Sequence, residues 1–321
     1  MNDHVHVQVL ILHLVIYRQL LHPCIGLYTV DKVAAIGSTF FDIWKYDIMA
    51  AQKEIIRLTE AQETLLIPLW CKSQAAQGKH VTFVDEKTES VLAGIDYNFS
   101  ALNVPKQTQV TVRMRANRFD VYAREFIAAH PDGMILHLGC GLDSRCLRVD
   151  NGRIHWVDLD MPDVIALRRK FYTETDRYRM IASPVTDLSW LDEIPKTAVS
   201  VLVIAEGLFM YLEEAHVKAL VLALQTAFPG CRLAFDAFSA LTAQRVGKHP
   251  SLQKTGASIH WGIDNAAEMA TWGTGIQLVE EWFFTQSPDM NRLDLGYRLI
   301  FKIASLFSVA KKAHRLLYFI L

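Results

Sequence analysis

The sequence predicts an α/β fold in which a mostly parallel sheet carries helices on both of its faces. Three observations predict it. Short apolar runs alternate with helical segments from residue 134 to residue 321. A Gly-x-Gly turn, Gly139 and Gly141, follows the first run at once, and carboxylates stand just after several of the later runs. Chains built in this way form doubly wound sheets, which bind ligands beyond the carboxyl ends of their strands.

Seven apolar runs are expected to form the strands. The fourth run, VSVLVIA, is almost wholly apolar, which is typical of a central strand in a parallel sheet. Asp143 or Ser144 is a candidate cap for a helix directly after the glycine turn. The expected strands are residues 134–138, 153–157, 178–182, 199–205, 232–238, 277–284 and 314–321. A helix is expected at 111–130, before the first strand, and others between the strands at 162–174, 213–228 and 297–307.

The chain divides into three expected parts. Residues 111–321 form the ligand-binding domain. Residues 31–110 form a helical cap, with helices at 40–59, 63–77 and 91–96, over the mouth where a substrate pocket would be built. Residues 1–30 form an extension of unknown role, in which the apolar run 9–17 falls short of the roughly 20 residues that span a bilayer. No Lys or Arg precedes that run, as a signal peptide would require.

Composition narrows the class of partner. The chain has 33 basic and 34 acidic residues and a formal net charge of −1, so no basic excess indicates nucleic acid. Its five cysteines are scattered and lack the spacing of metal ligands, which predicts free thiols in a reducing compartment and no metal. We therefore expect a cytoplasmic protein with no nucleic-acid or membrane partner, and the oligomeric state stays open.

The glycine turn and the acids after the second strand predict a nucleotide site. Asp158 and Asp160 lie 17 and 19 positions past Gly141, near the spacing of about 20 at which a carboxylate holds a ribose. Either of the two can serve. A dinucleotide site needs a third glycine, but Ser144 stands there, and Asp143 beside it would repel a diphosphate. A carboxylate at this place suits a sulfonium or an ammonium, which favours S-adenosylmethionine over NAD.

Other strand ends supply further candidates. Asp187, after the third strand, could accept a hydrogen bond from the amine of adenine, and Glu206 follows the fourth strand. In the helix before the first strand, Arg113, Arg115 and Arg118 either form a solvated basic face or include one guanidinium that holds the carboxylate of the methionine moiety.

Four segments in this order resemble the leucine carboxyl methyltransferase family, and the closer likeness is to its bacterial branch, similar to the O-methyltransferase of tetracenomycin polyketide synthesis. They are HLGCGLDSR (137–145), WVDLDMP (156–162), VTDL (185–188) and AEGLFMYL (205–212). The resemblance covers residues 55–321. It implies the class I, Rossmann-like methyltransferase fold, with a seven-stranded sheet whose last strand is antiparallel, and S-adenosylmethionine as the donor.

The resemblance also implies roles for single residues. Arg115 would bind the methionine carboxylate, and Lys72 could grip the same group. Gly139 and Gly141 would pass under the methionine, and Asp160, with Asp158 as its neighbour, would hold the ribose hydroxyls. The remaining positions would be Asp187 and Leu188 at adenine, Glu206 at the methionine end and Tyr211 at the reaction site, which makes Glu206 and Tyr211 the candidate catalytic residues.

The expected reaction is methyl transfer to a carboxylate or hydroxyl of a small molecule, including aromatic, polyketide-like ones. A carboxylate needs no base, whereas a phenol gains from one, for which the candidates are Tyr211, His249, His260 and Asp264. Phe238, Trp261 and Trp272 could form an apolar wall or belong to the core. Three alternatives remain: methylation of a protein C-terminal carboxylate, a non-catalytic interaction module, and a nicotinamide-dependent oxidoreductase, whose third glycine and Tyr-x-x-x-Lys relay are absent.

Overall fold

A computed structural model describes residues 65–74, 85–195, 200–247 and 258–321. All of them belong to one compact unit, Ile55–Leu321. The expected extension 1–30, the expected helix 40–59 and the candidate base His249 lie outside the described residues. The division of the chain at residues 30 and 110 therefore stays a prediction.

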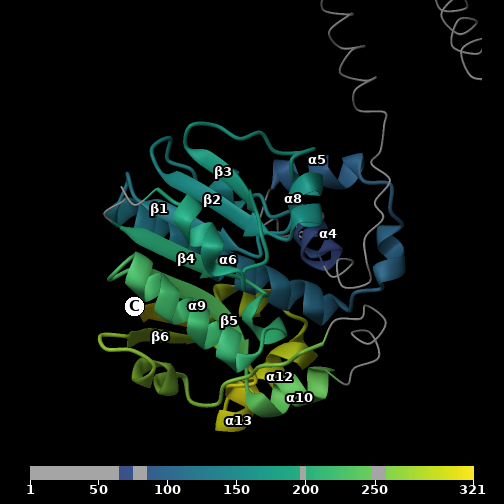
Figure 1. Ribbon diagram of the computed structural model, residues 1–321. Helices are drawn as coiled ribbons and strands as arrows, with labels where there is room; N and C mark the ends of the chain where they lie inside the picture. The colour runs from purple at the N-terminus through teal and green to yellow at the C-terminus, as the bar shows by residue number, and fades with distance from the viewer. Residues whose placement is uncertain (1–64, 75–84, 196–199, 248–257) are drawn as a thin grey trace, which may run out of the picture. The chain divides into compact units, whose positions relative to one another are not determined.

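A seven-stranded sheet forms the centre of the unit (Figure 1). The strand order is β3-β2-β1-β4-β5-β7-β6, and β7 runs antiparallel to both β5 and β6. The expected doubly wound sheet with an antiparallel last strand is confirmed. The strands are β1 Met134–Leu138, β2 His155–Asp160, β3 Tyr178–Ala182, β4 Val201–Ala205, β5 Arg232–Phe238, β6 Gln277–Phe283 and β7 His314–Ile320.

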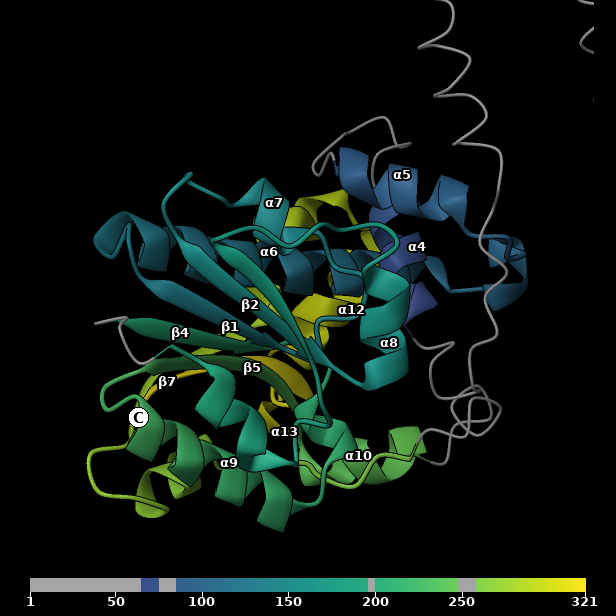
Figure 2. The ribbon, with the colours of Figure 1, turned by 45° about the horizontal axis from the view of Figure 1, so that its top comes forward.

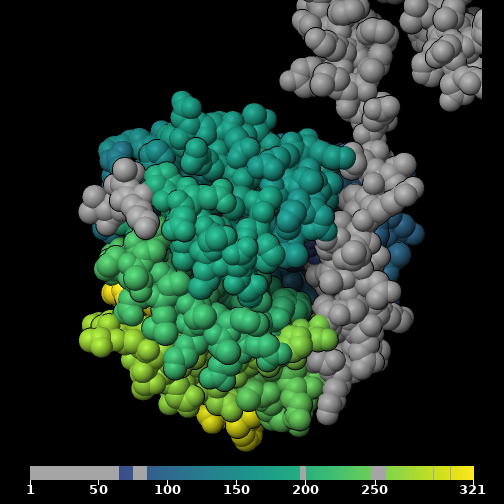
Figure 3. All heavy atoms as spheres, in the orientation of Figure 1, coloured from purple at the N-terminus to yellow at the C-terminus, as the bar shows by residue number. Residues whose placement is uncertain are grey.

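Helices cover both faces of the sheet, with α6 and α7 on one side and α9 on the other (Figure 2). In the space-filling view, the teal side chains of residues 150–195 and the green side chains around α9 form one continuous surface (Figure 3). The α-helices are α4 Leu66–Gln74, α5 Glu86–Gly94, α6 Lys106–Ala129, α7 Arg145–Arg148, α8 Pro162–Arg168, α9 Glu214–Ala227, α10 Ala240–Gly247, α12 Leu295–Ala304 and α13 Ser308–Lys311. The short 3₁₀ helices are η2 Phe99–Leu102, η3 Leu188–Glu193, η4 Phe209–Tyr211, η5 Ala266–Thr271, η6 Phe284–Gln286 and η7 Pro288–Arg292.

Several helix boundaries differ from those expected. α5 begins at Glu86 rather than at residue 91, because the Asp85 carboxylate caps it by accepting from the Thr88 N–H at 3.0 Å. The helix after the glycine turn, α7, has only four residues, and its Ser144 makes no side-chain cap bond. The expected helix 297–307 is two helices, α12 and α13.

Two hydrophobic clusters form the core, one on each face of the sheet. The β1 side chains alternate between them: Met134 and Leu136 pack in one cluster and Ile135 in the other. The first cluster takes its helical residues from α9, η3, η4 and η5, and the second from α4, α5, α6, α7, α8 and η6. This alternation follows from the period of two along a strand, so both faces of a central parallel strand are buried.

Two features are absent from the described part of the chain: a helix that could span a membrane and a group of side chains that could bind a metal. None of the described helices is long and apolar enough to cross a membrane. Among the same residues, no group of three or more His, Cys, Asp or Glu side chains could hold a metal ion. The four cysteines in the described segments, Cys71, Cys140, Cys146 and Cys231, are buried and free.

Candidate functional site

A cavity of about 200 Å³ opens beyond the carboxyl ends of β1 and β4, the edge where a doubly wound sheet binds its ligand. The turn after β1, residues 139–143, and the loop after β4, residues 206–211, form two of its sides. The charged side chains that line the cavity, Lys72, Arg115, Asp143 and Glu206, are joined by ion pairs directly or through Arg145, and together they form its polar end. The other side chains that line it are mostly apolar and include Leu65, Pro68, Leu69, Met210, Phe238, Val246 and Ile259.

The turn after β1 requires its two glycines. Gly139 and Gly141 have φ values of +63° and +52°, which side chains with a Cβ rarely adopt. A Cβ on Gly139 would also stand 3.0 Å from the Leu208 side chain. Both glycines line the cavity, as the sequence predicts, and their backbone is therefore open to a ligand.

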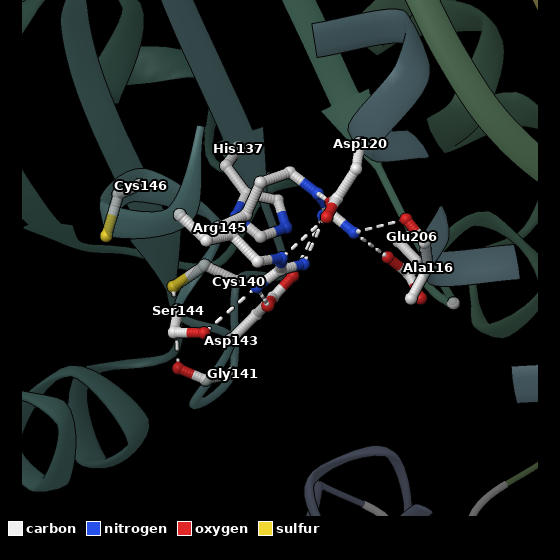
Figure 4. A network of polar contacts seen from close by, with 12 residues as sticks. Ala116, Asp120, His137, Cys140, Gly141, Asp143, Ser144, Arg145, Cys146 and Glu206 are labelled. Atoms are coloured by element: carbon white, nitrogen blue, oxygen red, sulfur yellow. Dashed lines mark hydrogen bonds and ion pairs between the residues drawn. The ribbon is translucent and has the colours of Figure 1, made fainter. Parts of the chain in front are cut away.

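A fully buried guanidinium, that of Arg145, joins the carboxylates behind the polar end of the cavity (Figure 4). It lies 2.7 Å from Asp120, 2.8 Å from Asp143 and 2.6 Å from Glu206. Removing an ion this deeply from water is costly unless every charge is paired. Three carboxylates from α6, the glycine turn and the β4 loop are thus fixed around one cation.

Arg115 lies next to this arrangement, on α6. Its Nε donates to Glu206 at 3.0 Å, and its Nη1 donates to Asp236 at 2.9 Å. Among the described residues, Nη2 has no hydrogen-bond acceptor, and it lies 3.3 Å from the place where a Cβ on Gly207 would stand. The guanidinium is therefore held in place by two carboxylates while one of its nitrogens stays available to a ligand.

These contacts belong to one set of nine linked charged side chains, which we call the ion-pair network. It consists of Lys72, Arg115, Arg145 and Arg148 with Asp85, Asp120, Asp143, Glu206 and Asp236. Four positive and five negative charges leave one net negative charge. S-adenosylmethionine, with a sulfonium, an ammonium and a carboxylate, carries one net positive charge near neutral pH, so the network complements it.

Two carboxylates of the network, Glu206 and Asp143, stay ionised. Burial alone would raise the pKa of Glu206, but Arg145, Arg115 and Lys72 outweigh it and hold that pKa below its ordinary value. Burial also raises the pKa of Asp143, but the cations Arg145, Arg148 and Lys72 outweigh it and hold that pKa well below its usual range. Both side chains therefore act as fixed negative charges and are poor proton acceptors. Of the catalytic roles expected for Glu206, the structure therefore favours an electrostatic one over that of a general base.

The structure changes the argument drawn from Asp143. The sequence argument treats its carboxylate as an unpaired charge facing the ligand. Instead, Lys72, Arg145 and Arg148 contact it at 2.8, 2.8 and 2.7 Å. The preference for a cationic ligand therefore rests on the sum of charges in the ion-pair network and not on Asp143 alone.

The structure separates the two candidate ribose ligands. Asp158 is fully buried; its oxygens accept from Trp156 Nε1 at 2.8 Å and from the Tyr178 hydroxyl at 2.7 Å, and it pairs with Arg168 at 2.5 Å. It could not reach a ligand without losing these partners, so we remove it from the predicted cofactor-binding set. Asp160, half-buried at the end of β2, accepts from the backbone N–H of Gly141 at 2.7 Å and keeps the ribose role as a prediction.

Asp187 and Leu188 lie on the β3 side of the same edge. Asp187 is exposed and caps η3, where its Oδ1 accepts from the Ser189 hydroxyl at 2.8 Å. Leu188 is half-buried and packs against the core cluster of that face. Neither residue lines the 200 Å³ cavity. Their roles at adenine stay predictions.

The remaining candidates divide between the cavity and the core. Tyr211 and Phe238 line the cavity, as does Lys72. Burial raises the pKa of Tyr211 against the opposing effect of Arg115, so its hydroxyl stays protonated and is a hydrogen-bond donor rather than a base.

Other candidates do not line the cavity. Trp261 is buried, with its ring centroid 6.1 Å from that of Phe235, which places it in the core. His260 pairs with Glu213 at 2.9 Å. Of the remaining predicted residues, Trp272, Asp264, Arg113 and Arg118 also lie away from the lining.

Sequence reasoning missed the residues that hold Arg115 and Glu206 in place. Asp236, in β5, accepts from Arg115 and from the Gly207 N–H at 2.6 Å, and it lies 2.8 Å from His314 Nε2. Arg145, the centre of the ion-pair network, stands within the segment HLGCGLDSR and had no assigned role. The only signal was an acid near the end of the fifth strand, the position that had drawn attention to Asp187 and Glu206.

Comparison with known proteins agrees with this geometry. Residues 82–225 match the family model described as leucine carboxyl methyltransferase. The chain is 38% identical over 236 residues to the tetracenomycin polyketide synthesis O-methyltransferase TcmP of Streptomyces glaucescens, covering 73% of this chain and 87% of the relative. It is 30% identical over 250 residues to the S-adenosyl-L-methionine-dependent methyltransferase dpfgK of Gibberella zeae, covering 71% of this chain and 84% of the relative.

A solved structure supports the fold. A DUF574 family protein from Streptomyces avermitilis superposes with a TM-score of 0.51 at 14% identity and covers 78% of this chain and 96% of its own. With the relatives above, and with a cavity whose charges complement the donor, the nicotinamide and non-catalytic alternatives fall away. The chain belongs to the leucine carboxyl methyltransferase family and is an S-adenosylmethionine-dependent methyltransferase.

Proposed function

We propose that the enzyme transfers the methyl group to an oxygen of a largely apolar small molecule, either a carboxylate or an acidic hydroxyl. The two-ended cavity carries this proposal. Its charged end suits the methionine part of the donor, and its apolar side chains leave a dry space beside it for an acceptor. The relative from Streptomyces glaucescens is named as an O-methyltransferase of polyketide synthesis, which supports oxygen as the acceptor atom.

The residues present fit the donor. The free edge of Arg115 would hold the methionine carboxylate, with Lys72 as a second cation, and Glu206 would face the ammonium. Gly139 and Gly141 leave room for the methionine chain, because a Cβ at Gly141 would stand 3.3 Å from Leu65. Asp160 would accept from the ribose hydroxyls, and Asp187 with Leu188 would frame adenine. When bound, the donor supplies an electrophilic methyl group on a positively charged sulfur.

The protein's own part in the reaction is alignment and exclusion of water. Methyl transfer is an in-line displacement, so rate depends on holding the acceptor oxygen opposite the sulfur in a water-poor space. Leu69, Met210 and Phe238 supply apolar walls, and Tyr211 can donate its hydroxyl hydrogen to the acceptor.

The state of the carboxylates restricts the acceptor. Asp143 and Glu206, the carboxylates that line the cavity, are held ionised in ion pairs and accept protons poorly. An acceptor that arrives already ionised needs no base. We therefore favour carboxylic acids and acidic phenols over ordinary alcohols, whose hydroxyls stay protonated at neutral pH.

The test uses methyl-labelled donor and a panel of aromatic acids, phenols of graded acidity, aliphatic alcohols and a peptide ending in a free carboxylate. We expect label on the acids or on the most acidic phenols, with rates among phenols that rise as their pKa falls. Mild base then separates the products, because methyl esters release methanol and aryl methyl ethers do not. Transfer to the peptide alone would favour the protein C-terminal alternative, and transfer to alcohols at equal rates would contradict the assigned acceptor.

A reducing compartment such as the cytoplasm remains the proposed location. The four free cysteines of the described residues support it. Burial raises the pKa of Cys71 to about 12 against Arg115 and Lys72, so this thiol stays protonated.

A further inference from the structure

An exposed apolar surface lies on α12 and α13, away from both hydrophobic clusters. On α12, Leu295, Leu299, Ile300 and Ile303 have exposed fractions of 79%, 59%, 59% and 49%. Leu306, Phe307 and Val309, which follow, are exposed at 80%, 62% and 62%. These seven residues, which we call the α12–α13 surface, are more than half of the twelve large exposed apolar side chains among the described residues. An apolar area concentrated in this way marks an interaction site.

The exposure is a property of one helix face. Tyr297 and Phe301, four positions apart, turn inward and pack against the second core cluster. Leu295, Leu299 and Ile303, also four apart, lie on the opposite side of the same helix. α12, drawn in yellow in Figure 1, is therefore anchored through one face while apolar side chains on its other face are exposed. A helix that served only to complete the core would present polar residues there.

The charged residues within the segment that carries this surface are all positive. From residue 295 to residue 321 the sequence contains no Asp or Glu. Arg298 and Lys302 on α12, and Lys311 with Lys312 after it, are the cations of the segment outside β7. The acid nearest in sequence, Asp294, already pairs with Lys106 at 3.1 Å. The surface thus combines exposed Leu, Ile and Phe side chains with unbalanced positive charge.

The combination of apolar side chains and positive charge distinguishes between two possible partners for this surface, a second copy of the chain and an anionic membrane. A second copy of the chain would bring the same patch against itself across a two-fold axis, placing its basic residues opposite one another with no acid of the segment to balance them. Anionic lipid headgroups supply the missing negative charge, and the acyl boundary takes the apolar side chains. We propose that the α12–α13 surface docks the enzyme on anionic membranes, as a peripheral contact and not as a membrane span.

The site lies close to this contact. The segment ends at His314, whose ring centroid is 4.7 Å from that of Phe238, a residue that lines the cavity. α12 and α13 also connect β6 to β7 at the sheet edge where the cavity opens. A docked enzyme would hold that edge near the lipid surface, where an apolar acceptor concentrates. This last step rests on the proposed function, whereas the docking itself does not.

Vesicle co-sedimentation of the full chain tests the docking. Vesicles of phosphatidylcholine with phosphatidylglycerol are compared with vesicles of phosphatidylcholine alone, at low and high salt. The test variant is Leu299→Glu/Phe307→Glu. The matched control, Leu147→Glu/Val279→Glu, places two charges at residues exposed at 54% and 53% on α7 and β6. Circular dichroism and thermal unfolding confirm that both variants fold.

We expect binding to the anionic vesicles that weakens with salt, falls about tenfold or more in the test variant and is unchanged in the control. Equal binding by the test variant would place any membrane contact elsewhere in the chain and overturn the proposal. Absence of vesicle binding by the unaltered protein would also overturn it. A dimer in light scattering that becomes monomeric only in the test variant would assign the surface to a second copy instead. None of these outcomes depends on the acceptor, so failure here leaves the proposed methyl transfer untouched.

Discussion

The two ends of the proposed donor site are built in different ways. At the methionine end, nine charged side chains form the ion-pair network, and its central guanidinium, Arg145, is fully buried. At the adenosine end, Asp160 is half-buried, Asp187 is exposed, and both bond only to neighbouring backbone and to Ser189. The first end is set by buried ion pairs, most of which join distant segments, and the second by a few hydrogen bonds. Changes that break the network should therefore cost more stability than changes at the second end, whose main cost should be in donor binding.

The largest effect is expected from Arg145→Met. The substitution removes the shared partner of Asp120, Asp143 and Glu206 and leaves buried carboxylates short of a counter-charge. We expect the free energy of unfolding to fall by about 3–5 kcal/mol, measured by urea denaturation. The control is Arg153→Met, which breaks a surface pair with Asp132 and should leave unfolding unchanged. Similar curves for the two variants would mean that the network does not support the fold.

The next effect separates the two neighbouring acids of β2. Asp160→Ala should weaken S-adenosylmethionine binding on the order of 30–100-fold in calorimetry, because two hydroxyl donors lose a charged acceptor. Its cost in stability is only about 1–2 kcal/mol, from the Gly141 and Met161 N–H groups that lose their acceptor.

Asp158→Ala should show the reverse pattern, since it leaves the buried Arg168 without its ion pair and costs about 3 kcal/mol of stability. The opposite result, in which the folded Asp158 variant loses affinity for the ligand and the Asp160 variant keeps it, would make Asp158 the ribose ligand and Asp160 the structural residue.

As the pH falls, Asp160 should take up a proton before the carboxylates of the methionine end do. Burial raises the pKa of Asp160 above its ordinary value of 3.8, against the Gly141 and Met161 N–H groups that lower it. Binding favours the ionised form, so donor affinity should begin to fall as pH drops through that raised pKa.

The carboxylates at the other end respond later. The pKa values of Asp143 and Glu206 are lowered, so the stability they contribute is complete above their unfolded values and is lost only as pH falls through the lower, folded ones. Calorimetry and circular dichroism over the same pH series should show loss of binding before loss of structure. Simultaneous loss would contradict the distinction.

The smallest effect is expected in the loop after β4. Gly207 has a φ of +67°, and a Cβ there would stand 3.3 Å from Arg115 Nη2, whereas Gly230, with a φ of +78°, has no atom within 4 Å of the place where its Cβ would stand. Ala at either site should cost about 1–2 kcal/mol of stability through backbone strain. Only Gly207→Ala should also displace Arg115 and weaken donor binding, by about threefold to tenfold in a titration. Equal donor affinity in the two variants would show that Arg115 does not need its present position.

The difference between the ends also explains what the sequence could reveal. The sheet was predictable because its apolar runs are local and end at Gly or Asp, as at Gly139 and Asp160. The glycine turn and the strand-end acids are local too. The network was not predictable, because most of its pairs join distant segments: Arg115 and Asp236 are 121 residues apart, and Arg145 and Glu206 are 61 apart.

The same limit applies to the choice between Asp158 and Asp160. They stand two positions apart on one strand, so both point to the same face, and only their neighbours distinguish them. Trp156, Tyr178 and Arg168 enclose Asp158, and no spacing rule in the sequence indicates that enclosure.

The most direct test of the methionine end compares two ligands on two proteins. S-adenosylhomocysteine contains the amino-acid moiety and methylthioadenosine lacks it, and both are titrated into the enzyme and into Arg115→Gln. We predict that the unaltered enzyme prefers S-adenosylhomocysteine, and that the variant loses about 10–100-fold of that preference while its affinity for methylthioadenosine holds. An unchanged preference in the Arg115 variant would contradict the account, because the guanidinium would then not be what recognises the donor's carboxylate.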